Sequence, residues 1–460
     1  MVLLTSVWRA ITHTKALDDS SGEMETSFFE TVYRITYIAG WSNSDHNSFF
    51  YKLYSNTVKL LIATFMVAEL WYMFTFVSTL DTVIEHRLLF SKSLFIQRMH
   101  EHVYKKLATS MQISKLDTST PTRKALVEYW MKKSETYLKL MLGLGNLTLA
   151  AWFAFPLVDD IEYNLTVGMR LGVDWRRPSR YPIVYTIHIV AFHYTAFFIM
   201  VNDAIMQAHL IHLVCQYTVL ADCFENILDD CEKEFKGLSR DQLVRDRRFR
   251  EVYISRLGLL VEQHKKILMH TMELRKTISP PMLGQVAASS LQICFAGYQA
   301  LTMSFIKFFM TLLFLGYNLF ELFIICRWCD EIKIQSENIN NALYCSGWEC
   351  GVATMAGVRT RLMLVATRAS KPLVLTAGGI TELSLNSYSN VCAASVFYMS
   401  EPEHQLVVRS VWNGWPVTST LSFVPRQSAC AIFLRQSGQS LTAQDRDLDG
   451  NITLGSTNCM

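Results

Sequence analysis

Polar side chains interrupt the last long apolar stretch of the chain, Lys371–Ser400, and their chemistry suits contact with water. They are Glu382, Ser384, Asn386, Ser387, Ser389, Asn390 and Ser395. A membrane helix needs about 20 residues, so the stretch is long enough to cross a bilayer. Lipid on all sides would not tolerate so many polar groups, and the segment must therefore face other protein or water. A water-facing helix inside a membrane predicts a channel or transporter.

Other residues whose side chains could take part in chemistry point less clearly to a function. Asp203 and Glu321 lie in apolar stretches, where carboxylates are functional candidates and where pairing inside a helix bundle is the alternative. His209 and His212 could share a helix face, but no further ligand completes a metal set. The calcium-loop-like run that begins at Asp445 lacks the required glutamate at its last position. No phosphate loop or hydrolase motif is present, so we expect no enzyme, no metal and no cofactor.

Composition indicates a membrane protein with several spans. The chain has 460 residues, of which 50% are hydrophobic and only 18% are charged. Charged residues make up roughly a quarter of the residues of a soluble domain. A net charge of +3 gives no support for nucleic-acid binding. The expected partner along most of the chain is the lipid bilayer.

Six long apolar segments predict membrane helices, and a seventh, 88–97, is about half the length that a span needs. The six are 58–80, 137–158, 183–213, 283–303, 305–326 and 375–400. We expect an all-α fold with seven transmembrane helices, the second of them truncated. The chain then divides into an amino-terminal segment, 1–57, a membrane domain, 58–400, and a polar tail, 401–460, expected to be disordered.

Lysine and arginine set the expected topology. The segment Ala221–Ile278 is densely basic, which favours the cytoplasm, and its apolar residues have helical spacing. We expect it to form cytosolic extensions of the neighbouring membrane helices, with a new helix starting at Pro280–Pro281. Seven spans then place the amino terminus in the cytoplasm and the loop Asp159–Pro182 outside. That loop carries the sequon at Asn164, an expected glycosylation site.

Aromatic residues gather in the outer halves of the predicted helices. An apolar pocket with few polar groups is the usual form of a small-molecule site, although ordinary packing and interfacial anchoring would also explain single aromatics. The candidate ligand-binding residues are Trp152, Phe155, Tyr185, His188, Phe192, Phe305 and Phe309.

The residues around the last span resemble the carboxyl-terminal signature of insect odorant receptors. The resemblance covers about Ser27–Ser400. It rests on Asn341–Tyr344, Trp348, Arg359–Leu364, Lys371–Leu373, Thr376–Gly379 and Leu383–Leu385.

This resemblance implies a tuning subunit of an odorant-gated, non-selective cation channel. Such a subunit forms a hetero-tetramer with an odorant co-receptor in the dendritic plasma membrane of olfactory sensory neurons. It binds small volatile odorants in the outer half of the helix bundle. The implied pore-lining stripe is Ser384, Ser387, Val391, Ala394, Ser395 and Tyr398. The implied anchor and subunit-interface residues are Tyr344, Trp348, Arg361, Leu364, Lys371, Pro372 and Leu373.

Three alternatives stay open from the sequence. A gustatory receptor would carry a Thr-Tyr pair in the last span, and a G-protein-coupled receptor would carry Asn-Pro-x-x-Tyr there; neither is seen. A degenerate, non-conducting member is the third. It is suggested by the truncated second span and by Glu401–His404, which stands where an apolar gate is expected.

Overall fold

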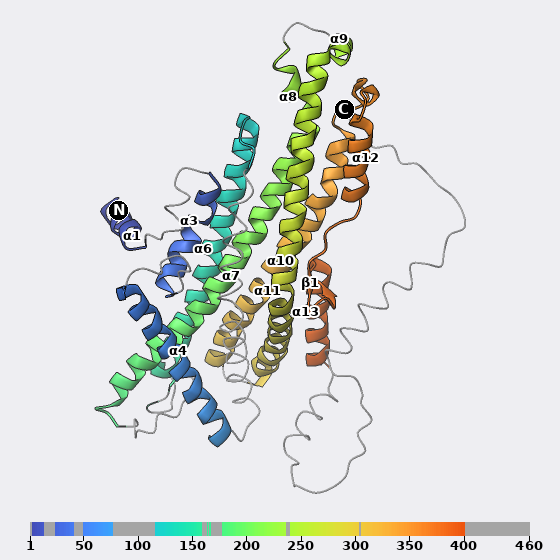
Figure 1. Ribbon diagram of the computed structural model, residues 1–460. Helices are drawn as coiled ribbons and strands as arrows, with labels where there is room; N and C mark the ends of the chain where they lie inside the picture. The colour runs from blue at the N-terminus through green and yellow to red at the C-terminus, as the bar shows by residue number, and fades with distance from the viewer. Residues whose placement is uncertain are drawn as a thin grey trace. The chain divides into compact units, whose positions relative to one another are not determined.

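The computed structural model describes residues 2–12, 24–40, 49–76, 116–158, 163, 165–166, 177–235, 240–302 and 305–400. Almost all of these residues are helical (Figure 1). The α-helices are α1 Val2–Ile11, α3 Met24–Ile38, α4 Phe49–Phe76, α6 Pro121–Val158, α7 Tyr181–Glu225, α8 Ile227–Glu232, α9 Arg240–Arg245, α10 Arg247–Thr302, α11 Phe305–Tyr344, α12 Val358–Ala369 and α13 Leu385–Ser400. A short 3₁₀ turn, η1, spans Val352–Thr354, and the strands β1, Thr376–Ala377, and β2, Thr381–Glu382, form an antiparallel hairpin.

Helix α7 is the central element, and α3, α4, α6, α10 and α11 all pack against it (Figure 1). Every residue from Phe198 to Tyr217 is buried. A stretch that is buried on every side lies inside the bundle, where its apolar residues pack and its polar residues, such as Asp203, need partners. The expected all-α fold is confirmed, apart from the small hairpin.

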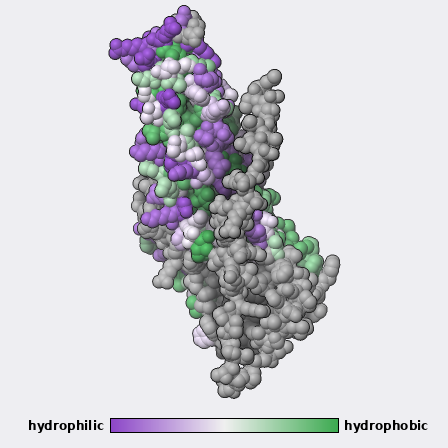
Figure 2. Space-filling model, turned by 90° about the vertical axis from the view of Figure 1, so that its right-hand side faces the viewer, coloured by the Kyte–Doolittle hydropathy of each residue, from purple (hydrophilic) through white to green (hydrophobic). Residues whose placement is uncertain are grey.

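Three of the described helices, α6, α7 and α11, are long and apolar enough to cross a membrane. Helix α7 has 45 residues and is therefore about 68 Å long, whereas the hydrocarbon core of a bilayer is about 30 Å thick. The helices consequently continue well past a membrane, as the sequence predicts. Figure 2 shows hydrophilic residues gathered at the end of the bundle that carries α8 and α9, which suits contact with water.

The expectation of a new helix at Pro280–Pro281 is wrong, because α10 runs through both prolines for 56 residues. Each proline removes one backbone donor from the helix but leaves the carbonyl groups in place. The neighbouring hairpin bonds to α10 at the residue just before the prolines, Ser279. The Gly378 amide donates to the Ser279 carbonyl oxygen at 2.8 Å, and the Gly379 amide donates to Ser279 Oγ at 3.2 Å.

The last predicted span, 375–400, is helical only from Leu385 onward. Gly378 and Gly379 have φ values of 61° and 74°, in the left-handed region that glycine adopts without strain, and they turn the chain between β1 and β2. The hairpin pairs Thr376 with Glu382 and Ala377 with Thr381. Ser384 Oγ then accepts from the Ser387 amide at 3.2 Å, which caps the start of α13.

Several sequence predictions lie outside the described residues. They are the truncated span 88–97, the polar tail 401–460 and the sequon residue Asn164.

The hairpin gives a sharp test of how α13 is held. A Cβ added at Gly378 would lie 2.6 Å from Leu283 Cδ2 on α10, whereas one added at Gly379 would have no neighbour within 4 Å. Both Gly→Ala changes carry the cost of a positive φ, about 1–2 kcal/mol. We therefore expect Gly378→Ala to lower the thermal unfolding midpoint of the detergent-purified protein more than Gly379→Ala does.

The clash itself can be tested by removing its second partner. Adding Leu283→Ala to Gly378→Ala should bring the midpoint back toward that of Gly379→Ala. Equal midpoints for the two single variants would show that α10 and the hairpin are not in close contact.

Candidate functional site

A cavity lies between α6, α7, α10 and α11. It encloses about 590 Å³ between atoms, part of it open to solvent, and about 70 Å³ can hold the centre of a water-sized molecule. The lining consists of Gly145, Thr148, Leu149 and Trp152 from α6, Phe192, Ala196, Ile199 and Met200 from α7, Gln292 from α10, and Phe314, Tyr317 and Asn318 from α11. Residues three, four and seven apart share a helix face, so each of the longer runs presents one face to the cavity.

Aromatic rings form one wall of this cavity. The Trp152 and Phe192 rings stack with centroids 6.1 Å apart and an interplanar angle of 9°, and the Phe314 ring lies 5.5 Å from that of Trp152. Such a surface suits an apolar or aromatic small molecule.

Polar atoms in the lining fall into two groups. Thr148 Oγ1 and Asn318 Nδ2 donate to carbonyl oxygens of their own helices, at 2.9 and 2.8 Å. Trp152 Nε1, Gln292 Oε1 and the Tyr317 hydroxyl are buried without a hydrogen-bond partner in the part of the chain that the structure describes. The cavity thus holds unused hydrogen-bonding capacity in an apolar setting.

Gly145 sets how closely three helices approach at the cavity. A Cβ at this position would lie 2.2 Å from Met200 Sδ on α7 and 3.2 Å from Tyr317 Cε2 on α11. Any larger residue must displace one of these side chains. The only residue type that fits here unchanged is therefore glycine.

A polar bridge joins three of the cavity helices, one helical turn from the lining on α7 and α11 and two turns from it on α10. Gln285 Nε2 on α10 donates to Asp203 Oδ1 on α7 at 2.9 Å and to Glu321 Oε1 on α11 at 2.6 Å. All three residues are buried. Asp203 follows Met200 by three positions, and Glu321 follows Asn318 by three. Of the two expectations for these carboxylates, pairing inside the bundle is therefore what the structure shows.

Some of the predicted ligand-binding residues line the cavity, and others pack behind the residues that line it. Trp152 and Phe192 line the cavity. His188 stacks on the Phe192 ring, with centroids 6.3 Å apart, and the Tyr185 hydroxyl donates to the Phe153 carbonyl, so both lie behind the wall. Phe155 is half-buried and does not belong to the lining, Phe309 is 55% exposed, and the Phe305 side chain is not described.

The predicted pore stripe on α13 faces the rest of the chain at the three positions whose side chains are described. Val391 is 4% exposed, Ser384 is 9% exposed and serves as the helix cap, and Ser387 Oγ donates to the Glu382 carbonyl at 2.6 Å. The side chains of Ala394, Ser395 and Tyr398 lie outside the described residues. The open face of α13 instead carries Asn386, Ser389, Asn390 and Ala393.

Most of the predicted anchor residues are on the surface. Tyr344 is 74% exposed, Trp348 39% and Leu364 66%. Arg361, Lys371 and Pro372 are also exposed, and Arg361 donates to the Ile254 carbonyl at 3.3 Å. Leu373 differs, because it is 7% exposed and its amide donates to Ser336 Oγ at 3.2 Å. It packs within its own chain and is not available for a contact between chains.

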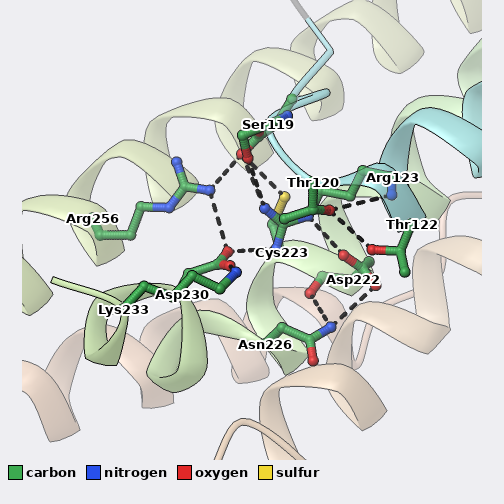
Figure 3. Close-up of polar contacts among 11 residues, drawn as sticks. Ser119, Thr120, Thr122, Arg123, Asp222, Cys223, Asn226, Asp230, Lys233 and Arg256 are labelled. Atoms are coloured by element: carbon green, nitrogen blue, oxygen red, sulfur yellow. Dashed lines mark hydrogen bonds and ion pairs between the residues drawn. The ribbon is translucent and has the colours of Figure 1, made fainter. Parts of the chain in front are cut away.

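An ionic cluster joins the start of α6 to α7, α8 and α10 (Figure 3). The Arg123 guanidinium donates to Asp222 at 2.7 Å, to Asp230 at 2.6 Å and to Asp117 at 3.4 Å, and its side chain is 1% exposed. Arg256 on α10 adds a further hydrogen bond to Asp117. Arg123 Nη1 also donates to Ser119 Oγ at 3.2 Å. A buried arginine is stabilising only when its donors are paired, and here most of them are directed at carboxylates.

Two aspartates of the cluster, Asp117 and Asp230, have a depressed pKa and remain ionised at neutral pH. Burial raises the pKa of the Asp117 carboxyl, but hydrogen bonds from Arg256 and Ser119 outweigh burial and hold this pKa well below its usual range. Lys233 and Arg123 likewise lower the pKa of Asp230 against the effect of burial. Because both folded-state pKa values are depressed, their stabilisation is present at neutral pH and is lost only as the pH falls below about 4.

Comparison with known proteins gives the class to which this arrangement belongs. The sequence model described as 7tm Odorant receptor matches residues 73–396, which is more than half of the chain. The chain belongs to this family of odorant receptors.

Individual relatives are distant. Odorant receptor 67a of Drosophila melanogaster is 24% identical over 323 residues, which cover 64% of this chain and 75% of the relative. Odorant receptor 94a of the same species is 22% identical over 270 residues, covering 56% of this chain and 63% of the relative. The olfactory receptor OR5 of Machilis hrabei, solved alone, has a TM-score of 0.68 at 17% identity, covering 84% of this chain and 98% of that one. Its complex with eugenol has a TM-score of 0.67. The fold is thus the seven-helix membrane bundle of insect odorant receptors.

The ionic cluster predicts a large effect of one substitution. Arg123→Met would leave three aspartates without their shared partner, and breaking such a buried set costs about 3–5 kcal/mol. We expect a clear fall in the thermal unfolding midpoint of the purified protein. The control is Arg247→Met, since the Arg247 side chain is 91% exposed and pairs with Glu251 one turn away. Equal shifts for the two variants would contradict a structural role for the cluster.

Proposed function

We propose that this protein is a tuning subunit of an odorant-gated, non-selective cation channel. It assembles as a hetero-tetramer with an odorant co-receptor in the plasma membrane of olfactory sensory neuron dendrites. The observation that carries the proposal is the mainly apolar cavity between four helices in a chain of the odorant receptor family. Small volatile molecules are the ligands that such a cavity suits, because burial of their apolar surface supplies most of the binding energy.

The cavity is the proposed odorant site. Its aromatic wall of Trp152, Phe192 and Phe314 offers rings for contact, and its limited free space favours compact ligands. Met200 is flexible and can make room by changing rotamer. A related receptor of the same fold has been solved in complex with eugenol, a molecule of this size class.

For the ion pathway we propose the open face of α13. Asn386, Ser389 and Asn390 are polar and exposed, which is unfavourable for a surface in contact with lipid. Contact with water and with other subunits removes this difficulty. The face thus replaces the stripe that includes Ser384 and Val391, both of which are buried within the chain.

Contacts between subunits are proposed at the opposite part of the molecule, where α11 and α12 end. Tyr344, Trp348 and Leu364 expose large apolar surfaces there. Exposed apolar side chains in this number are typical of protein interfaces. The basic residues of α9 and α10 favour the cytoplasm for this end.

The odorant site is tested by a matched pair of glycine substitutions. Gly145→Ala places a methyl group against Met200 and Tyr317, whereas a Cβ at Gly143 on the same helix has no neighbour within 4 Å. Co-expressed with the co-receptor, Gly145→Ala should raise the half-maximal odorant concentration about tenfold, as expected for overpacking of a cavity. Gly143→Ala should change it little.

Whole-cell current is recorded for the full chain and for a chain that stops after Ser400. Odorant-evoked current that requires a G protein would contradict the channel proposal. Absence of current from both chains despite surface expression would identify a non-conducting member. Equal effects of the two glycine substitutions would place the odorant elsewhere.

The pore face is tested by cysteine substitution. Ser389→Cys and Asn390→Cys should react with a water-soluble thiol reagent, and the reaction should change the odorant-evoked current. Val391→Cys, one position away but buried, should stay unreactive. The parent chain treated with the same reagent corrects for its 11 native cysteines. Equal inertness at all three positions would argue against a pore at this face.

A further inference from the structure

Three side chains that line the cavity carry buried polar atoms without hydrogen-bond partners in the described part of the chain. They are Trp152 Nε1, Gln292 Oε1 and the Tyr317 hydroxyl. Gln292 is 4% exposed and Tyr317 is 9% exposed, so neither group is compensated by bulk water. A buried polar atom left unpaired is unfavourable, and a ligand that supplies the missing partner gains the difference.

The chemistry of these atoms limits what the partner can be. The Gln292 oxygen only accepts hydrogen bonds, the Trp152 ring nitrogen only donates, and the Tyr317 hydroxyl does both. A hydroxyl group on a ligand can donate to Gln292 and also accept from Trp152 or Tyr317. An ether oxygen can accept only, and a hydrocarbon can do neither. The lining therefore favours a ligand with a hydroxyl group.

Charge and shape narrow the ligand further. None of the described lining residues is charged, so a charged ligand would lose its hydration without gaining a counter-ion in the lining. The stacked Trp152 and Phe192 rings and the neighbouring Phe314 ring offer faces and edges to an aromatic ligand. A neutral aromatic alcohol meets all of these conditions.

We propose that the cavity selects small, neutral, aromatic alcohols, and that Gln292 determines this selectivity by accepting the hydrogen bond of the ligand hydroxyl. The proposal rests on the proposed function, because it takes the cavity to be the odorant site. It adds the chemical class of the ligand and a residue on α10 that discriminates within that class.

The test compares 2-phenylethanol with its methyl ether, with propylbenzene and with 2-phenylethylamine. Binding to the purified full-length protein is followed by tryptophan fluorescence, and Trp152→Phe identifies the part of the signal that comes from the cavity. Channel current in cells with the co-receptor is recorded in parallel. The wild-type protein should prefer the alcohol to the ether by about tenfold, because a site built around a hydroxyl leaves a polar atom unpaired with the ether.

Gln292→Leu should reduce this preference to about threefold or less while retaining affinity for propylbenzene. The matched control is Gln207→Leu. Gln207 is also a buried glutamine whose Oε1 has no hydrogen-bond partner among the described residues, but it does not belong to the cavity lining. Gln207→Leu should leave the ratio of alcohol to ether unchanged, which separates a selective role of Gln292 from a general effect of losing a buried amide.

The outcomes separate the two proposals. Fluorescence binding with a Gln292-dependent alcohol preference but no current would support the ligand class and contradict the channel function. Current evoked equally well by alcohol and ether would leave the channel function standing and overturn the ligand class. Strongest binding of the amine, or no binding of the alcohol up to its solubility, would also overturn it.

Discussion

One side-chain amide, that of Gln285, sets the arrangement of the three helices around the cavity. Its two N–H groups are directed at carboxylates on two different helices, Asp203 and Glu321. Polar groups are costly inside a membrane bundle unless they are satisfied, so rotating any of the three helices about its axis would break one of these buried hydrogen bonds at a cost. The bridge therefore fixes which faces of α7, α10 and α11 look inward. The positions of the cavity residues follow from this choice: Asn318 lies one turn from Glu321 and Gln292 lies two turns from Gln285, and both line the same space.

Sequence reasoning identified the helices and one wall of the cavity but not its other side. Trp152 and Phe192 could be predicted, because aromatics near the outer ends of apolar helices are a visible signal. Gln292 and Tyr317 could not, since α10 and α11 lack a strong polar face that would give their rotation in the bundle. A useful signal was present in the polar residues at seven-residue spacing, Gln285 and Gln292, which lie on one face of α10.

The other features that could not be predicted from the sequence also have physical explanations. The ionic cluster joins Arg123 to Asp222 and Asp230, about a hundred residues away, and no local pattern reports so distant a contact. The hairpin before α13 was hidden because apolar residues surround Gly378 and Gly379, and length alone favoured one long helix. The open side of α13 could not be read from the sequence because polar residues occur on several of its sides, and only burial shows that Ser384 and Val391 face the chain.

The contact between the hairpin and α10 has a consequence for motion. Pro280 and Pro281 cannot donate to the carbonyls one turn before them, so α10 is most easily bent at this level. The Gly378 amide is bonded to the Ser279 carbonyl at the same level, and α13 begins only a few residues further on. Helix α10 also packs against β1 and α13, so a bend of α10 at the prolines would displace the hairpin and the start of α13 with it. The helix that contributes Gln292 to the cavity is thus in contact with the hairpin and with the helix that carries the open polar face.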